Sequence, residues 1–183
     1  MVRPLSRHAR LAGVTLLELM TVIVIIGILA TMLIPATSAM FSRMEKAKCI
    51  FNLKALWVGT EFFLQDRMYW PQIDARLLQD KQSDQYARQW MAALEPYKVS
   101  KETWHCPTVG KQLPAEVKSG AAKKERIDYF PTPFDNKQMT PHRWPDQPWF
   151  IERGAVHGEG NLIIFPDGSI KTLDQLIAKQ KKK

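Results

Sequence analysis

The stretch AGVTLLELMTVIVIIGILATMLIPA, from Ala12 to Ala36, is almost wholly apolar. Between Leu16 and Ile34 it carries a single charge, the carboxylate of Glu18. A helix of this length can cross the hydrocarbon core of a bilayer. A carboxylate inside that core costs about 2.5 kcal/mol or more at the helix centre, so such a residue is usually paired or functional. We therefore expect a membrane-spanning helix in which Glu18 has a specific role.

The charges ahead of the apolar stretch indicate how it is oriented. Residues 1–13 contain Arg3, Arg7 and Arg10 and no acidic residue. Positive charges keep a short flanking segment in the cytoplasm, so the C-terminal bulk of the chain is expected to cross the membrane. The residues after the apolar stretch suffice for one domain with a modest core. The formal net charge of +8 makes the whole chain mildly basic.

Three interpretations of the N-terminus compete. A secretory signal would be cleaved at the small residues ATSA, after Ala39. The apolar core is longer than is usual for such a signal, and Glu18 is unexpected inside one. An uncleaved anchor fits the length but gives Glu18 no role. The third interpretation gives the carboxylate a role.

The segment from Gly13 to Leu19, GVTLLEL, resembles the processing motif of type IV prepilins and type II secretion pseudopilins. The resemblance implies that a prepilin peptidase cuts after Gly13 and methylates the new amine of Val14, where the family usually has Phe. It also implies that Glu18 acts in assembly. When subunits stack, Glu18 can neutralise the N-terminal ammonium of a neighbour, so two charges that are costly in lipid become one pair.

The same resemblance implies an α+β fold. A long N-terminal transmembrane and amphipathic helix would pack on a small globular head with a C-terminal antiparallel β-hairpin sheet. Pro35 falls where pilin helices commonly carry a proline, and it should bend or locally melt the helix because it lacks a donor and clashes one turn back. The expected divisions are a basic leader peptide at 1–13, the transmembrane half of the helix at 14–35, its extracytoplasmic half at 36–66 and the globular head at 67–183.

Helical periodicity continues past the membrane segment. Apolar residues recur at steps of three and four at Met44, Ala47, Phe51, Ala55, Val58 and Phe62. We expect one helix from Val14 to about Gln65, with its second half under the globular domain. The aromatic residues of this half are expected in the domain core and not in a ligand site; they are Phe51, Trp57, Phe62 and Phe63.

Two cysteines, Cys49 and Cys106, would face an oxidising compartment. Pilin-like proteins with small heads often show a Cys before Asn-Leu-Lys and a later Cys-Pro segment, so the resemblance implies a disulfide here. Such a bridge would stabilise the fold by about 4 kcal/mol in the chain-entropy model. The rival interpretation is a metal site of Cys106, His105 and His157. The sequence lacks a CxxC pair and the ligand spacing that zinc sites show.

The C-terminal part predicts a β-hairpin. Asn161–Phe165 and Ile170–Leu173 flank a Pro-Asp-Gly-Ser turn, and the segment resembles the terminal motif of many pilin-like proteins. Two interpretations remain open for Asp167. It forms a weak calcium site with Glu159 and His157, as in some pseudopilins, or it serves only the turn.

The middle of the chain carries weaker signals. Residues 83–94 predict a short second helix. Residues 107–148 are rich in Pro and Lys, which favours extended loops. Trp144, Trp149 and Phe150 beside Arg143 are only a weak sign of nucleic-acid stacking, so nucleic acid is not an expected partner.

No catalytic constellation emerges, so neither an enzyme nor a cofactor is expected. By resemblance, the chain is a structural subunit, a pilin or pseudopilin, of a type IV pilus or type II secretion pseudopilus. It would be a single-pass inner-membrane protein with a periplasmic or extracellular C-terminal domain. The implied partners are prepilin peptidase, other pilin or pseudopilin subunits, the inner-membrane assembly platform and membrane lipid. The alternative is a membrane-anchored or secreted extracytoplasmic binding domain that does not form filaments.

Overall fold

The computed structural model describes residues 15–78, 83–113, 125–158 and 160–181, with the backbone alone at 32–39. The chain divides into two compact units, Met1–Phe41 and Ser42–Lys183. Helix α1 (Leu16–Arg67) runs through the boundary between them. The predicted long helix is therefore present, and it ends at Arg67, within two residues of the expected end at about Gln65.

The first unit contains the N-terminal part of α1. The helix begins with a capping contact, in which the backbone amide of Glu18 donates to Oγ1 of Thr15 at 3.2 Å. Every described side chain from Leu16 to Thr31 is exposed. The helix is unbroken at Pro35, so the predicted local melting is wrong, whereas the predicted bend stays a prediction.

Within the described residues, none of the helices combines the length and the apolar character needed to cross a membrane.

The second unit, Ser42–Lys183, is an α+β domain, and we refer to this whole unit as the head from here on. Its described strands form a four-stranded antiparallel sheet in the order β1-β2-β3-β4, which confirms the expected fold class at this coarse level. Phe150 pairs with Ile164 between β2 and β3, and Ile164 pairs with Ile170 between β3 and β4. The elements that follow α1 are η1 (Ala75–Leu78), α2 (Ser83–Leu94), η2 (Glu95–Tyr97), η3 (Lys101–Trp104), α3 (Pro107–Gln112), β1 (Tyr129–Pro131), α5 (Thr140–Arg143), β2 (Phe150–Glu152), β3 (Leu162–Ile164), β4 (Ile170–Thr172) and α6 (Leu173–Gln180).

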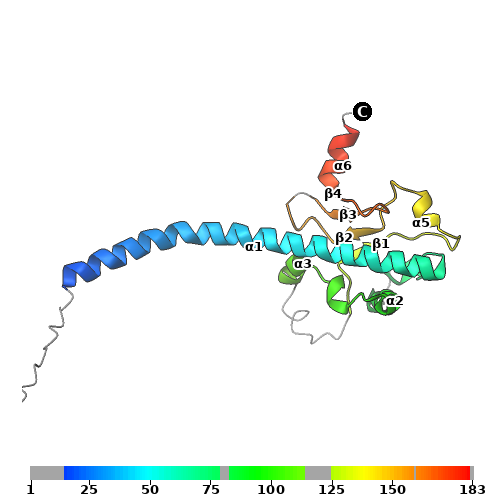
Figure 1. The fold of residues 1–183 in the computed structure, drawn as a ribbon, viewed down its shortest axis with the longest axis horizontal. Helices are drawn as coiled ribbons and strands as arrows, with labels where there is room; N and C mark the ends of the chain where they lie inside the picture. Colours follow the sequence, from blue (N-terminus) through cyan, green and yellow to red (C-terminus); the bar gives the residue numbers. More distant parts are fainter. Residues whose placement is uncertain (1–14, 79–82, 114–124, 159, 182–183) are drawn as a thin grey trace, which may run out of the picture. The chain divides into compact units, whose positions relative to one another are not determined.

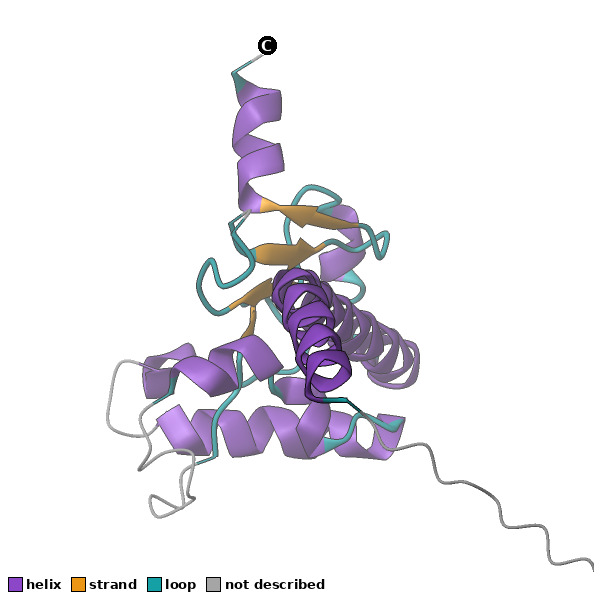
Figure 2. Cartoon of the chain, turned by 90° about the vertical axis from the view of Figure 1, so that its left-hand side faces the viewer, coloured by secondary structure: helices purple, strands orange, loops and turns teal. Residues whose placement is uncertain are grey.

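In this unit the second half of α1 lies between two layers. The sheet covers one side of the helix, and α2 and α3 lie on the other side (Figures 1 and 2). Asn52 donates to the carbonyl of His105 at 2.9 Å on the helical side, and Nε1 of Trp57 donates to the carbonyl of Pro166 at 3.0 Å on the sheet side. These contacts place α1 at the centre of the head.

Tryptophans fill the core where the layers meet. Trp70, Trp90, Trp104 and Trp149 are at most 2% exposed. Trp70 lies edge-on to Trp90 and Trp149, with ring centroids 5.8 and 5.4 Å away. Such geometry adds about 0.5–1.5 kcal/mol per pair to the burial of the rings.

Two local predictions are confirmed and one is wrong. Helix α2 spans the expected residues 83–94, and β3 and β4 form the expected hairpin. Gly168 in its turn has φ +73°, which favours glycine. The segment 107–148 is not simply loop, because α3, β1 and α5 lie in it. Strand β1 tolerates Pro131 because it is the edge strand, where a missing donor costs no ladder bond.

Candidate functional site

The apolar stripe predicted on α1 points away from the core of the head. Met44, Phe51, Val58 and Phe62 are 55%, 63%, 42% and 53% exposed, and we refer to these four residues as the exposed stripe. The prediction that Phe51 and Phe62 lie in the core is therefore wrong. That prediction is confirmed for Phe63, which is buried, and Trp57 is partly buried against the core.

A different side of the same helix packs inward. Cys49, Leu53, Leu56 and Leu64 are fully buried, together with Asn52. The helix thus carries apolar residues on two sides, and periodicity alone does not tell which side meets the domain. The sequence signal that could have separated them is the cysteine, because a disulfide partner must lie in the head.

Three residues of the exposed stripe contribute to one wall of a groove of about 700 Å³. Phe51, Val58 and Phe62 line it from α1, and Pro96 and Tyr97 line it from η2. Gly59 brings the two walls together, because a Cβ at this position would overlap the side chain of Val99. Contiguous exposed apolar surface of this kind usually marks an interaction site.

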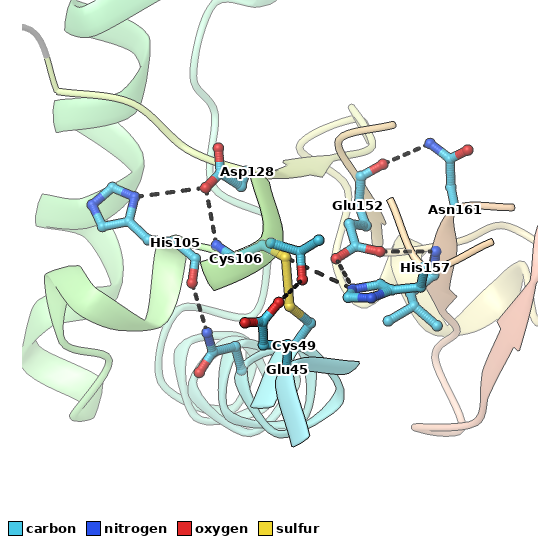
Figure 3. A network of polar contacts seen from close by, with 11 residues as sticks. Glu45, Cys49, His105, Cys106, Asp128, Glu152, His157 and Asn161 are labelled. Carbon is cyan, nitrogen blue, oxygen red and sulfur yellow. Dashed lines mark hydrogen bonds and ion pairs between the residues drawn. A yellow bond between two sulfur atoms is a disulfide. The ribbon is translucent and has the colours of Figure 1, made fainter. Parts of the chain in front are cut away.

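The second candidate feature is the disulfide between Cys49 and Cys106, the pair that was expected from the sequence. Both cysteines are fully buried, and their Cα atoms lie 5.4 Å apart. The bridge ties α1 to the start of α3 (Figure 3). Glu45, one turn before Cys49, reinforces this tie by accepting hydrogen bonds from Thr108 and Lys111 of α3, and these contacts lower its pKa.

A buried carboxylate positions the Cys106 backbone. Oδ2 of Asp128 accepts the amide of Cys106 at 2.9 Å and lies 3.1 Å from Nη2 of Arg126. Burial raises the pKa of Asp128, and the charge of Arg126 opposes that rise. Nδ1 of His105 lies 4.0 Å from the same oxygen, and burial lowers the pKa of this imidazole. His105 therefore faces Asp128.

On the other side of the disulfide, His157 meets Glu152. Their side chains are 3% and 0% exposed, with Nε2 of His157 3.1 Å from Oε1 of Glu152. Nε2 of His157 is also 3.8 Å from Sγ of Cys106. Burial raises the pKa of Glu152 to about 7, while the Leu162 amide and Lys46 act in the opposite direction. Figure 3 shows both side chains turned toward the disulfide.

Ligand-type atoms from four residues converge here. One atom each of Cys49, Cys106, Glu152 and His157 lies within 4.8 Å of the others, and we call this set the Cys–Glu–His cluster. The sequence suggested a metal site of Cys106, His105 and His157 as the alternative to a disulfide. Among the described residues, the Cys–Glu–His cluster contains Cys106 and His157 but not His105.

Sequence reasoning missed Glu152. Glu152 and Phe150 lie two residues apart in β2, so their side chains point to the same, buried face of the sheet. The available signal was therefore an acidic residue at a buried strand position. Recognising it required knowing where β2 begins and ends, and the sequence marks this three-residue strand weakly.

Of the three predicted calcium ligands, the structure describes Asp167 and His157. Oδ1 of Asp167 accepts the amide of Ser169 at 2.8 Å within the hairpin turn, which favours the turn interpretation. His157 belongs to the Cys–Glu–His cluster instead. Glu159 lies outside the described residues.

The remaining predicted residues are placed as follows. Glu18 is exposed in the first turn of α1. Gly13 and Val14 lie outside the described residues. Trp149 is fully buried and Trp144 is 61% exposed, so these tryptophans do not form a shared stacking surface.

A comparison of the chain with protein-family models, curated proteins and solved structures finds no match.

Proposed function

We propose that the chain is a structural subunit, a pilin or pseudopilin, of a type IV pilus or type II secretion pseudopilus. The observation that carries the proposal is that α1 leaves apolar side chains exposed in each compact unit. These side chains are the large apolar ones among the described residues Leu16–Thr31 in the first unit and those of the exposed stripe in the second. An isolated soluble domain rarely leaves so much apolar surface without a partner.

The N-terminal motif supplies the second support. The peptidase cuts after Gly13, and the new amine of Val14 is methylated. Glu18 stands in the first turn of α1, where a carboxylate interacts favourably with the helix dipole. In an assembled filament this carboxylate pairs with the N-terminal ammonium of the next subunit. The membrane span from Leu16 to Ile34 and the inner-membrane location rest on the sequence.

The occupant proposed for the groove is the α1 helix of a neighbouring subunit. Once a subunit leaves the lipid, its Leu16–Thr31 surface needs an apolar cover. The exposed stripe offers one, because its aromatic and aliphatic side chains lie along one helix face and suit ridges-into-grooves packing. The pilin-like arrangement of a long helix on a small head serves this stacking.

The competing function is an anchored or secreted extracytoplasmic binding domain. The groove beside the exposed stripe favours it specifically, since an apolar ligand of small size fits its volume of about 700 Å³. The two functions differ in what lies against Phe62: another copy of the chain or a small molecule.

Photo-crosslinking separates these functions. A photoreactive phenylalanine analogue is placed at Phe62 in one version of the full chain and at Ile177 of α6 in the matched control, since both side chains are about half exposed. In cells that process the chain, the subunit function predicts a ladder of crosslinked multimers from position 62 and none from position 177. A binding domain predicts monomers from both positions.

A further inference from the structure

The Cys–Glu–His cluster gathers side chains from three parts of the head. Cys49 comes from α1, Cys106 precedes α3, Glu152 ends β2, and His157 lies in the loop that follows β2. All four are buried or nearly so, and Figure 3 shows them on one side of the helix. A stabilising disulfide alone does not require an imidazole and a carboxylate directed at it.

Two distances between the ligand atoms are close to those of tetrahedral zinc. Bond lengths of about 2.3 Å to sulfur and 2.0–2.2 Å to nitrogen and oxygen place neighbouring ligand atoms about 3.3–3.8 Å apart. Nε2 of His157 is 3.8 Å from Sγ of Cys106 and 3.1 Å from Oε1 of Glu152. The second distance is slightly shorter than this range, and the two sulfur atoms, which are bonded to each other, lie too close together; all four ligand atoms lie within 4.8 Å of one another.

We propose that the head binds one Zn²⁺ through Cys49, Cys106, Glu152 and His157 when the disulfide is reduced. The disulfide and the metal are then alternative occupants of one place. A dithiol provides the two electrons: its thiolate attacks one sulfur of the bridge, its second thiol closes its own disulfide, and both cysteines leave as thiols. Zn²⁺ binding then releases the thiol protons.

The surroundings suit a closed structural zinc site. Two thiolates, a carboxylate and a neutral imidazole leave one net negative charge around Zn²⁺, and the positive charge of Lys46 acts on Glu152. Hydrogen bonds to groups outside the cluster position two of the ligands. The Leu162 amide donates to Oε2 of Glu152 at 3.4 Å, and the Cys106 amide donates to Oδ2 of Asp128 at 2.9 Å.

The donor set selects the metal. Two thiolates and an imidazole favour zinc, whereas calcium and magnesium prefer oxygen ligands. The calcium interpretation of His157 is thereby replaced by a different metal and a different set of partners. This inference does not depend on filament assembly, because every ligand belongs to the head.

The test uses the full chain in detergent, reduced with a trialkylphosphine, which takes up oxygen from water as it reduces the disulfide to two thiols. Co²⁺ is titrated as a spectroscopic substitute for Zn²⁺. The reduced protein should bind one Co²⁺ with thiolate-to-metal charge transfer and tetrahedral visible bands, and Zn²⁺ should displace it. The oxidised protein should give neither signal.

Two variants assign the ligands. Glu152→Gln and His157→Ala should each weaken Co²⁺ binding by the reduced protein at least tenfold. His142→Ala is the matched control, because His142 lies beside Glu61 outside the cluster, and it should bind as the wild type does. Circular dichroism of the oxidised variants checks that each retains its fold.

Three results would overturn the proposal: no tetrahedral cobalt spectrum in the reduced wild type, equal binding before and after reduction, or unchanged affinity in both ligand variants. If reduction unfolds the head, restoration of its circular dichroism by Zn²⁺ supports the proposal. Failure of Zn²⁺ to restore it counts against the site. None of these results bears on assembly through α1.

Discussion

Nε2 of His157 lies 3.1 Å from Oε1 of Glu152, and both side chains are buried beside the Cys49–Cys106 disulfide. The pair fastens the loop after β2 to the strand itself. Asn161 adds to this by donating to the Glu152 carbonyl at 2.8 Å. The polar network thus holds the sheet close to the bridge that joins α1 and α3.

Loss of the imidazole should destabilise the oxidised head. His157→Ala leaves a buried carboxylate without this partner, which should lower the free energy of unfolding by about 2–3 kcal/mol. Urea unfolding followed by tryptophan fluorescence measures it. Arg76→Ala is the control, because its ion pair with Asp74 is exposed and should contribute little to stability. A loss no larger than that of the control would contradict the assigned role of His157.

Glu152 should make stability depend on pH. Its pKa is about 7 in the folded protein against an ordinary value of 4.5, so the folded state keeps a proton that the unfolded chain loses. The resulting stabilisation is complete below about pH 4.5 and is lost as the pH rises to about 7. The titratable and charged groups around it are His157, Asp128 and Lys46.

Glu152→Gln isolates this effect because glutamine does not ionise. Relative to the wild type, the variant should be more stable at pH 8 than at pH 4, by at most about 3–4 kcal/mol at about 1.4 kcal/mol per pKa unit. Urea unfolding of the oxidised proteins at both pH values provides the comparison. A difference between variant and wild type that does not change with pH would show that Glu152 keeps an ordinary pKa.

Gly59 should be intolerant of a side chain. In Gly59→Ala the new methyl group overlaps Val99, and we expect a loss of about 1–3 kcal/mol in the stability of the head. Val99→Ala in the same chain should recover part of that loss, which a double-mutant cycle measures. Gly27→Ala, where a Cβ meets no atom within 4 Å, is the control and should leave head unfolding unchanged. Additive effects of the two substitutions would refute the contact.

The exposed stripe should matter for association more than for stability. Phe62→Ser is expected to change the free energy of unfolding by no more than about 0.5 kcal/mol, because the ring is 53% exposed. Leu53→Ala, at a fully buried position of the same helix, should cost about 2–5 kcal/mol. Multimers in the membrane should decrease for Phe62→Ser at equal protein levels. Unchanged multimers would argue for a stripe without a protein partner.

Much of the fold follows from local signals in the sequence. The long apolar and periodic run predicts α1, and the Asp-Gly turn predicts the hairpin. Two cysteines allow one intramolecular disulfide. Periodicity does not show which side of α1 meets the head, because both sides carry apolar residues; Cys49 is the residue that marks the inward side. Glu152 was missed because tertiary pairing, and not a strong local pattern, defines its short strand.

The role of Glu18 can be measured directly. Glu18→Gln keeps the shape of the side chain and removes its charge, so cleavage after Gly13 should persist while assembly falls sharply. The head should be unaffected, because its core and disulfide lie in the other compact unit. A simple anchor predicts the opposite, since removing a carboxylate from lipid favours insertion.

The measurement is the amount of assembled protein recovered by shearing cells or by crosslinking membranes, compared between wild type and Glu18→Gln at equal levels of processed chain. Glu18→Asp is the matched control, because it keeps the charge on a shorter side chain and should assemble better than Glu18→Gln. Assembly that falls sharply in Glu18→Gln is the predicted result. Equal assembly in Glu18→Gln and wild type would contradict the filament subunit and favour an anchored extracytoplasmic binding domain.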